Sequence, residues 1–129
     1  MRYDGVHCRL SIERPAAGVV VLQLTGWDVG EFGDAPMKAL EQDVARGGIR
    51  FFIDARAVKA ATIDVSNDWA LWLRQHKARF ISIHMLTGAP FVQLTAKFVQ
   101  RFAELGDLMR IYTDAAVFDR ELAAVTGRA

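Results

Sequence analysis

Residues 49–86 read IRFFIDARAVKAATIDVSNDWALWLRQHKARFISIHML, and this stretch decides the fold. It begins with the short apolar run 49–53 and ends with the apolar run 80–86, both typical of buried strands. We expect Asp54 to end the first strand, where the chain turns over the edge of the sheet. Between the runs, residues 65–79 carry one apolar stripe at helical spacing, made of Trp69, Trp72, Leu73 and His76. A strand, a helix and a second strand in this order predict a parallel βαβ unit.

The segment before this unit predicts a β-hairpin and a helix. Residues 8–14 alternate apolar and polar side chains, residues 18–25 are rich in β-branched ones, and the turn 15–18 (PAAG) separates them. Residues 33–46 then place apolar side chains at helical spacing, and the pair Gly47-Gly48 ends that helix.

The segment after the unit predicts two further helices and a strand. Pro90 suits the first turn of a helix, because its missing N–H would have no partner there. This helix ends at Gly106, the strand 108–112 follows, and a closing helix runs from its cap Asp114 to about residue 125. The helix after Pro90 has the clearest amphipathic pattern in the chain, and we expect its apolar stripe on the buried side. The stripe consists of Phe91, Leu94, Phe98, Phe102 and Leu105, opposite the wetter Gln93, Lys97, Gln100, Arg101 and Glu104.

The resulting order β-β-α-β-α-β-α-β-α predicts an α/β fold. A strand followed by a helix, four times in succession, favours a mostly parallel sheet of about five strands flanked by about four helices. The N-terminal hairpin supplies an antiparallel edge strand. With 129 residues, the chain predicts a single domain over residues 1–129.

Composition excludes several classes of partner. Hydrophobic residues make up 52% of the chain and charged residues 24%, which is typical of a folded globular domain. The formal net charge of +1 gives no general attraction to nucleic acid or to an anionic membrane. The apolar runs are shorter than the roughly 20 residues of a membrane helix, and the single cysteine, Cys8, excludes an internal disulfide. We therefore expect a cytoplasmic protein that has no nucleic-acid or membrane partner.

Three segments carry a resemblance to a known family: GVVVLQLTGWD (18–28), RFFIDARAV (50–58) and LMRIYTDAAVFDREL (108–122). With the order of elements, they resemble STAS domains (sulfate transporter and anti-sigma factor antagonist), particularly the divergent SpoIIAA-like branch, over residues 8–125. The resemblance implies a non-catalytic domain of bacterial signalling. It also implies a protein partner, an anti-sigma factor or another regulatory protein, and it leaves a homodimer open.

The phosphorylation motif of that family is not preserved. In the anti-sigma antagonists, a serine within Asp-Ser-Ser/Thr-Gly begins the helix after the strand that ends in Asp, and a partner kinase phosphorylates it. Counting forward from Asp54 puts Ile63 at the serine position, whereas alignment on Asp64 puts Val65 there and Ser66 one position later. The resemblance therefore does not predict the standard phosphoserine switch.

Residues 59–68 remain the predicted docking surface, because the resemblance places the family's partner contacts there. Thr62, Asp64 and Ser66 are the candidate residues for partner binding or for a displaced phosphate. All three residue types also cap helix N-termini, where free N–H groups attract anions, so a purely structural capping role is the competing interpretation.

Enzymatic interpretations have less support. Asp54 and Thr87 match two positions of a response-regulator receiver, but a receiver also needs an acidic pair for Mg²⁺ and a Lys after its last strand. Asp28 is alone, and residues 112–114 (YTD) contain no Lys, so a degenerate receiver is the weaker alternative. The three histidines lack zinc-site spacing, and neither a nucleophile motif nor a Gly-rich phosphate loop occurs. We expect no enzyme activity, metal or cofactor.

Four aromatic residues suggest the other alternative, a carrier for a small apolar ligand. Trp27, Trp69, Trp72 and Phe91 are predicted near one another, where they would border an apolar pocket or contact patch between helix and sheet. Aromatic residues at helical spacing also commonly pack against a sheet, so core packing is the competing interpretation. A fully packed core in this region would exclude the carrier.

Overall fold

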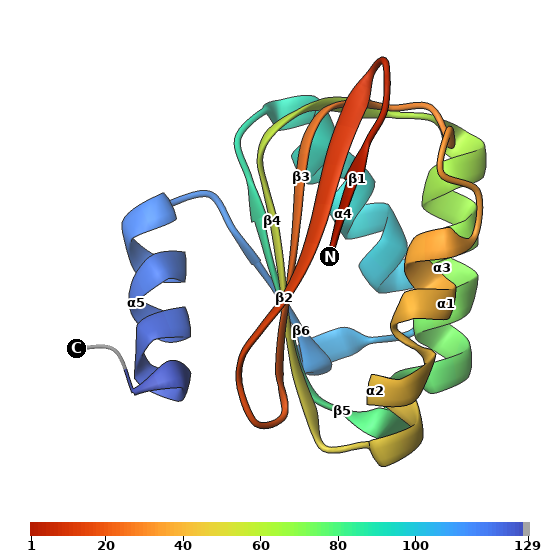
Figure 1. The fold of residues 1–129 in the computed structure, drawn as a ribbon. Helices are drawn as coiled ribbons and strands as arrows, with labels where there is room; N and C mark the ends of the chain where they lie inside the picture. Colours follow the sequence, from red (N-terminus) through yellow and green to blue (C-terminus); the bar gives the residue numbers. More distant parts are fainter. Residues whose placement is uncertain (128–129) are drawn as a thin grey trace.

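A computed structural model describes residues 1–127 of the chain, in which six strands form one sheet and five α-helices pack on it (Figure 1). The strands are β1 (Arg2–Asp4), β2 (Cys8–Ala16), β3 (Val19–Asp28), β4 (Ile49–Ala61), β5 (Phe80–Thr87) and β6 (Met109–Tyr112). The helices are α1 (Ala35–Ala39), α2 (Glu41–Arg46), α3 (Ile63–His76), α4 (Pro90–Phe102) and α5 (Ala115–Thr126). Two short 3₁₀ turns, η1 (Lys77–Arg79) and η2 (Gly106–Leu108), precede β5 and β6.

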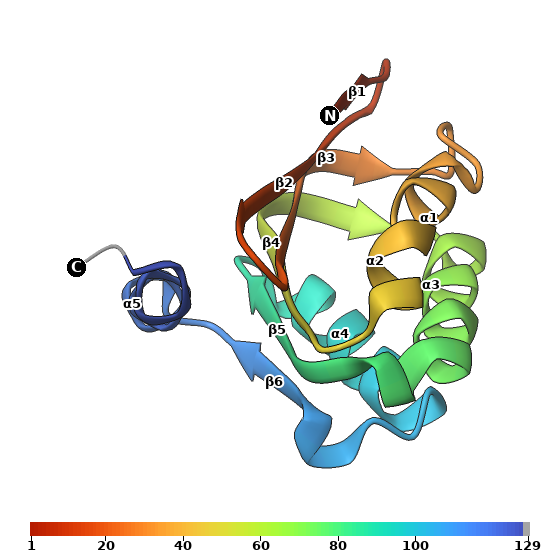
Figure 2. The same ribbon diagram turned by 60° about the horizontal axis from the view of Figure 1, so that its bottom comes forward.

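The strands lie in the sheet in the order in which they occur in the chain. β1, β2 and β3 are antiparallel neighbours, and β3 to β6 are parallel. Each parallel step needs a right-handed crossover, and successive crossovers in one direction put their helices on the same face. Helices α1 to α4 accordingly cover one face, whereas α5, which follows the last strand, lies on the other (Figures 1 and 2).

The core has two parts, one on each face of the sheet. Phe51 and Phe52 are consecutive in β4 and almost fully buried, and they point to opposite faces. Phe51 belongs to the main core between the sheet and α1 to α4, together with Ile83 of β5. Phe52 packs beneath α5 against Phe118. The fold is thus α/β, with a mixed sheet between a layer of four helices and the single helix α5.

The N-terminal region differs from the prediction in two places. The hairpin of β2 and β3 is confirmed, but it is not the edge, because Tyr3 of β1 pairs with Leu10 of β2. β1 has only three residues and no apolar periodicity, so the sequence contains no signal for it. The helix predicted over 33–46 is interrupted at Leu40, which is almost fully buried between α1 and α2.

The prediction that Asp54 ends a strand was wrong. β4 continues to Ala61, because its neighbour β3 also continues and pairs with it as far as Asp28. Exposed Arg56 and Lys59 interrupt the apolar pattern in this second half of β4. Backbone pairing with β3, which apolar periodicity does not report, maintains the strand there.

The predicted orientation of α4 was also wrong. The side chains of α4 that face the core are small, namely Val92, Ala96 and Val99, and they let the helix lie close to the sheet. The aromatic stripe predicted to be buried instead faces outward, with the following exposed fractions: Phe91 63%, Leu94 64%, Phe98 43% and Phe102 39%. Only Leu105, beyond the end of the helix, is buried as predicted.

Candidate functional site

The junction between β4 and α3 positions the predicted docking residues. Thr62 is the N-cap of α3, and its Oγ1 accepts a hydrogen bond from the Val65 N–H at 3.3 Å. The Thr62 N–H donates to the carbonyl oxygen of Asp28 at the end of β3, at 3.0 Å. The Ser66 hydroxyl donates to the carbonyl oxygen of Thr62, also at 3.0 Å. These bonds fix the first turn of α3 against the ends of β3 and β4.

The three candidate residues differ in accessibility. Thr62 and Asp64 are exposed, whereas Ser66 is only 7% exposed and its hydroxyl is engaged within the helix. Between the two exposed candidates lies Ile63, whose side chain is 79% exposed. The first turn of α3 therefore offers a partner one large aliphatic side chain flanked by two polar ones. Ile63 is not among the contact residues predicted from the sequence, although its place outside the buried stripe of α3 was a usable signal.

The outward stripe of α4 continues this exposed apolar area. Phe98 and Phe102 stack on each other with ring centroids 5.6 Å apart. A groove of about 340 Å³ runs between the start of α3 and the first half of α4, and Ile63, Leu94 and Phe98 are among its walls. We call this area the α3–α4 surface, and it consists of Ile63, Phe91, Leu94, Phe98 and Phe102 with Thr62 and Asp64 on its rim.

A small cavity lies beneath the groove, between α3, α4 and the sheet. Its volume is about 80 Å³, and its lining is apolar apart from three polar residues. Two of these, Ser66 and Thr95, also line the groove and so lie between the two spaces. The third is Asp28, which is 8% exposed. Asp28 is not among the pocket residues predicted from the sequence, because no local pattern marks it as one.

The environment of Asp28 disfavours its charged form. Its Oδ1 accepts a hydrogen bond from the Gly30 N–H at 3.2 Å. Burial raises the pKa of the Asp28 carboxyl, the nearby negative charge of Glu31 raises it further, and the bond from Gly30 offsets part of the increase. Asp28 therefore borders the cavity with a higher proton affinity than an exposed aspartate has.

The four aromatic residues predicted to border one pocket do not line a common space, although Trp69 and Trp72 are in edge-on contact with ring centroids 5.7 Å apart. Trp69 lines the cavity, and Phe91 lines the groove above it. Trp72 is instead buried in the main core, edge-on to Phe51 with ring centroids 6.5 Å apart. Trp27 is 51% exposed and lines neither space. Trp69 and Phe91 thus line two different spaces, Trp72 has the core-packing role that was the competing interpretation, and Trp27 borders neither space.

The geometry does not support a receiver-like phosphorylation site. Asp54 and the cavity residue Asp28 lie on opposite faces of the sheet, whereas a receiver brings its acidic residues to one metal. Arg56 binds Asp54 through Nε at 3.0 Å and Asp119 of α5 through Nη2 at 2.6 Å, which ties α5 to the sheet. The Thr87 hydroxyl donates to the carbonyl oxygen of Tyr112 at 3.2 Å. These residues therefore have structural roles.

His84 forms a buried polar network on the α5 side of the sheet. Its Nδ1 lies 2.8 Å from the Tyr112 hydroxyl, and its Nε2 lies 2.8 Å from the Ser82 hydroxyl. The ring stacks on Phe52 with centroids 4.2 Å apart. Burial lowers the pKa of His84, and the positive charge of Arg110 lowers it further. Both ring nitrogens have partners, so the histidine serves the packing of the sheet.

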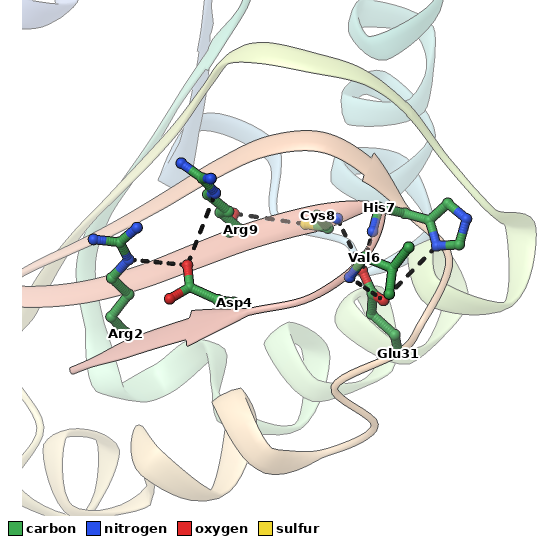
Figure 3. Close-up of polar contacts among 7 residues, drawn as sticks. All are labelled: Arg2, Asp4, Val6, His7, Cys8, Arg9 and Glu31. Carbon is green, nitrogen blue, oxygen red and sulfur yellow. Dashed lines mark hydrogen bonds and ion pairs between the residues drawn. The ribbon is translucent and has the colours of Figure 1, made fainter.

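Glu31 connects the loop after β3 to the turn between β1 and β2 (Figure 3). Its carboxylate accepts hydrogen bonds from the backbone N–H groups of Val6 and His7, both at 3.0 Å, and of Cys8 at 2.8 Å. These bonds outweigh the opposing effect of desolvation and lower the pKa of Glu31. Burial, with the charges of Asp28 and Glu31, raises the pKa of the Cys8 thiol to about 11. Cys8 is consequently a protonated core residue at neutral pH.

Two features are absent from residues 1–127, a metal-binding cluster and a membrane-spanning helix. No group of three or more His, Cys, Asp or Glu side chains in this range is placed to hold a metal ion. None of the helices in the described part of the chain combines the length and the apolar character that crossing a bilayer requires.

Comparison with known proteins identifies the fold. No family model matches the chain, and no curated protein matches it in sequence. Solved structures do match, and one of them is the anti-sigma factor antagonist SpoIIAA in its unphosphorylated form. The two chains are 16% identical, the match covers 88% of this chain and 96% of SpoIIAA, and the TM-score is 0.56.

Two other solved structures resemble the chain to a similar degree. An anti-sigma factor antagonist from Mycobacterium paratuberculosis is 18% identical, with 92% of this chain and 93% of that protein covered and a TM-score of 0.59. An uncharacterized protein of the DUF3478 family from Shewanella loihica, with a SpoIIAA-like fold, is 14% identical, with coverages of 93% and 98% and a TM-score of 0.65. The chain therefore has a SpoIIAA-like fold over nearly its whole length.

Proposed function

We propose that this chain is a non-catalytic regulatory domain of the anti-sigma-antagonist type, which acts in the cytoplasm by docking to a protein partner through the α3–α4 surface. The observation that carries the proposal is the outward stripe of α4. Phe91 and Leu94 are each more than 60% exposed, and Ile63 at the start of α3 extends the apolar area. Contiguous exposed apolar side chains of this size mark interaction sites, because leaving them in water forgoes the free energy of burial.

The position of the surface in the fold supports the same function. It includes the start of the helix that follows β4, which is the region where the resemblance to the anti-sigma antagonists places partner contacts. Thr62 and Asp64 flank Ile63 there, and both are exposed. An apolar centre with a polar rim is the usual composition of a protein interface. We assign Thr62 and Asp64 to the rim and Ile63 to the centre.

The test compares partner binding by two matched charge variants. Leu94→Arg puts a cation in the middle of the α3–α4 surface. Ile81→Arg does the same at an equally apolar side chain, 51% exposed, that lies beside Gly48 at the turn before β4. Each tagged protein is expressed in the native host, and the captured partner is identified, purified and titrated by calorimetry.

We expect Leu94→Arg to weaken the partner complex by about 30-fold or more, which corresponds to the loss of one interface hot spot of about 2 kcal/mol. Ile81→Arg should bind as the wild type does. Equal binding by all three proteins would remove the α3–α4 surface from the proposal. If the captured complex contains only a second copy of the chain, the α3–α4 surface forms a homodimer and does not bind a separate regulatory protein.

The cavity favours a second candidate function, the binding of a small apolar ligand. The region between α3, α4 and the sheet is not fully packed, and Trp69 is one of its walls. Ligand binding and partner docking use different side chains, since the cavity residues are buried and the docking residues are exposed.

A further inference from the structure

β1 is the outermost strand of the sheet, and β2 is its one neighbour within residues 1–127 (Figure 2). Met1 and Ile12 exchange two backbone hydrogen bonds, of 2.8 Å to the Met1 carbonyl oxygen and 3.2 Å to the Ile12 carbonyl oxygen. Bonded and non-bonded pairs alternate along an antiparallel ladder, so the next bonded residue of β1 is Tyr3. The N–H and C=O groups of Arg2 and Asp4 therefore point away from β2, toward the free edge.

The side chains of Arg2 and Asp4 put opposite charges on one face of this edge. Both are exposed, and Arg2 Nε lies 3.0 Å from Asp4 Oδ1 (Figure 3). Arg9, which is opposite Asp4 on β2, approaches the same carboxylate to 3.9 Å. Tyr3 lies between the two charges in sequence and contacts Phe32, with ring centroids 5.7 Å apart. Ion pairs as exposed as these contribute little to stability, so both charges are available to a second chain.

We propose that β1 pairs with the β1 strand of a second copy of this chain, antiparallel and about a two-fold axis at Tyr3, so that the two sheets become one. Each Arg2 then lies opposite the partner's Asp4. Each copy contributes two N–H and two C=O groups, so the pairing forms four backbone hydrogen bonds and two opposite-charge contacts. A register shifted by two residues would put Arg2 opposite Arg2 or Asp4 opposite Asp4, which like charges disfavour.

The edge fits a second copy because its charges are complementary to themselves. A two-fold interface uses the same surface on both chains, and a short strand with a cation near one end and an anion near the other satisfies this condition. Met1 and Val6, at opposite ends of β1, are 63% and 90% exposed. Antiparallel pairing brings Met1 of each copy toward the partner's Val6. This interface is additional to docking through the α3–α4 surface and does not depend on it.

Sedimentation equilibrium of the wild type measures self-association. The contact is much smaller than a standard interface of about 1,600 Å², so we expect a weak dimer with a dissociation constant between about 10 μM and 1 mM. A wild type that stays monomeric at about 1 mM would overturn the proposal.

Charge variants test the register. Asp4→Arg makes both cross-strand pairs repulsive and should weaken the dimer about tenfold or more. Asp107→Arg is the matched control, because it makes the same change in η2, at the opposite edge of the sheet, and should leave the dimer unchanged. An equimolar mixture of the Asp4→Arg and Arg2→Asp variants should form a heterodimer, because every pair in it is of opposite charge. A mixture that does not associate, or equal weakening by Asp107→Arg, would overturn the proposal.

Two further variants separate backbone pairing from docking. Asp4→Pro removes an N–H that points to the free edge and leaves the bonds between β1 and β2, so it should weaken the dimer about tenfold. Leu94→Arg should dimerise as the wild type does. A dimer that Leu94→Arg abolishes and Asp4→Arg retains would place self-association on the α3–α4 surface and overturn the proposal. Capture of a regulatory partner by Asp4→Arg should stay at the wild-type level, so a failure of the β1 interface is distinguishable from a failure of docking.

Discussion

The outward orientation of the α4 aromatic stripe predicts that two Phe→Ala substitutions have very different costs. Phe118 is 1% exposed and packs edge-on against Phe52 and Tyr112, with ring centroids 5.7 Å and 5.6 Å away. Truncating a phenylalanine in such a core costs about 3–5 kcal/mol of unfolding free energy. Phe98 is 43% exposed and has one aromatic neighbour, Phe102. Full burial of a phenylalanine side chain contributes roughly 1.5–3 kcal/mol to the unfolding free energy, and Phe98→Ala would remove only about half of that. Alanine also favours the helix more than phenylalanine does, which offsets about 0.5 kcal/mol of the loss.

We therefore expect Phe118→Ala to lower the unfolding free energy by about 3–5 kcal/mol and Phe98→Ala by about 1 kcal/mol or less. Urea denaturation followed by far-UV circular dichroism measures both. Val99→Ala is the matched control on the inner side of α4, where Val99 is 7% exposed. It removes only two carbons yet should cost about 2 kcal/mol, more than Phe98→Ala. A Phe98→Ala cost equal to that of Phe118→Ala would refute the outward orientation of the stripe.

Three further predictions follow from the ionisable groups. The folded-state pKa of His84 lies below its unfolded-state value, so the unfolded chain takes up the proton first as the pH decreases. The unfolding free energy should therefore fall as the pH decreases through about 6.5. Urea denaturation at several pH values should show that the unfolding free energy of His84→Gln depends less on pH than that of the wild type. The pKa of Asp28 is raised, so its ionisation opposes folding, and Asp28→Asn should increase the melting temperature more at pH 7 than at pH 4. The Glu31 carboxylate accepts hydrogen bonds from the backbone N–H groups of Val6, His7 and Cys8, so Glu31→Gln should accelerate hydrogen exchange at these amides. NMR at pH 7 measures the exchange rates. Unchanged rates would contradict the role of the carboxylate.

The order of the elements could be predicted from the sequence because each parallel strand and helix carries its own apolar periodicity. The orientation of α4 could not, because both sides of this helix are apolar. The stripe with Phe98 has the larger side chains, and the stripe with Ala96 has the smaller ones that fit against the sheet. Which stripe is buried depends on the distance between helix and sheet, and a single segment does not contain that information.

The candidate site was predictable to a similar extent. Thr62 was identified because a capping residue before an apolar stripe is a local signal, and the structure places it at the N-cap. The exposure of Ile63 and the burial of Ser66 depend on how α3 lies on the sheet. The position of Asp28 beside the cavity depends on α3 and α4 together, which are far from it in sequence. Those properties arise only from tertiary packing.

The most direct test of the docking surface is site-specific photo-crosslinking in the native host. Benzoylphenylalanine at position 94 places the reactive group on the α3–α4 surface, and the same residue at position 81 places it beside the turn before β4. We expect one covalent adduct with a second protein from position 94, which is lost when Ile63 is changed to Arg, and no adduct from position 81. An adduct from position 81 alone, or equal adducts from both positions, would contradict docking through the α3–α4 surface.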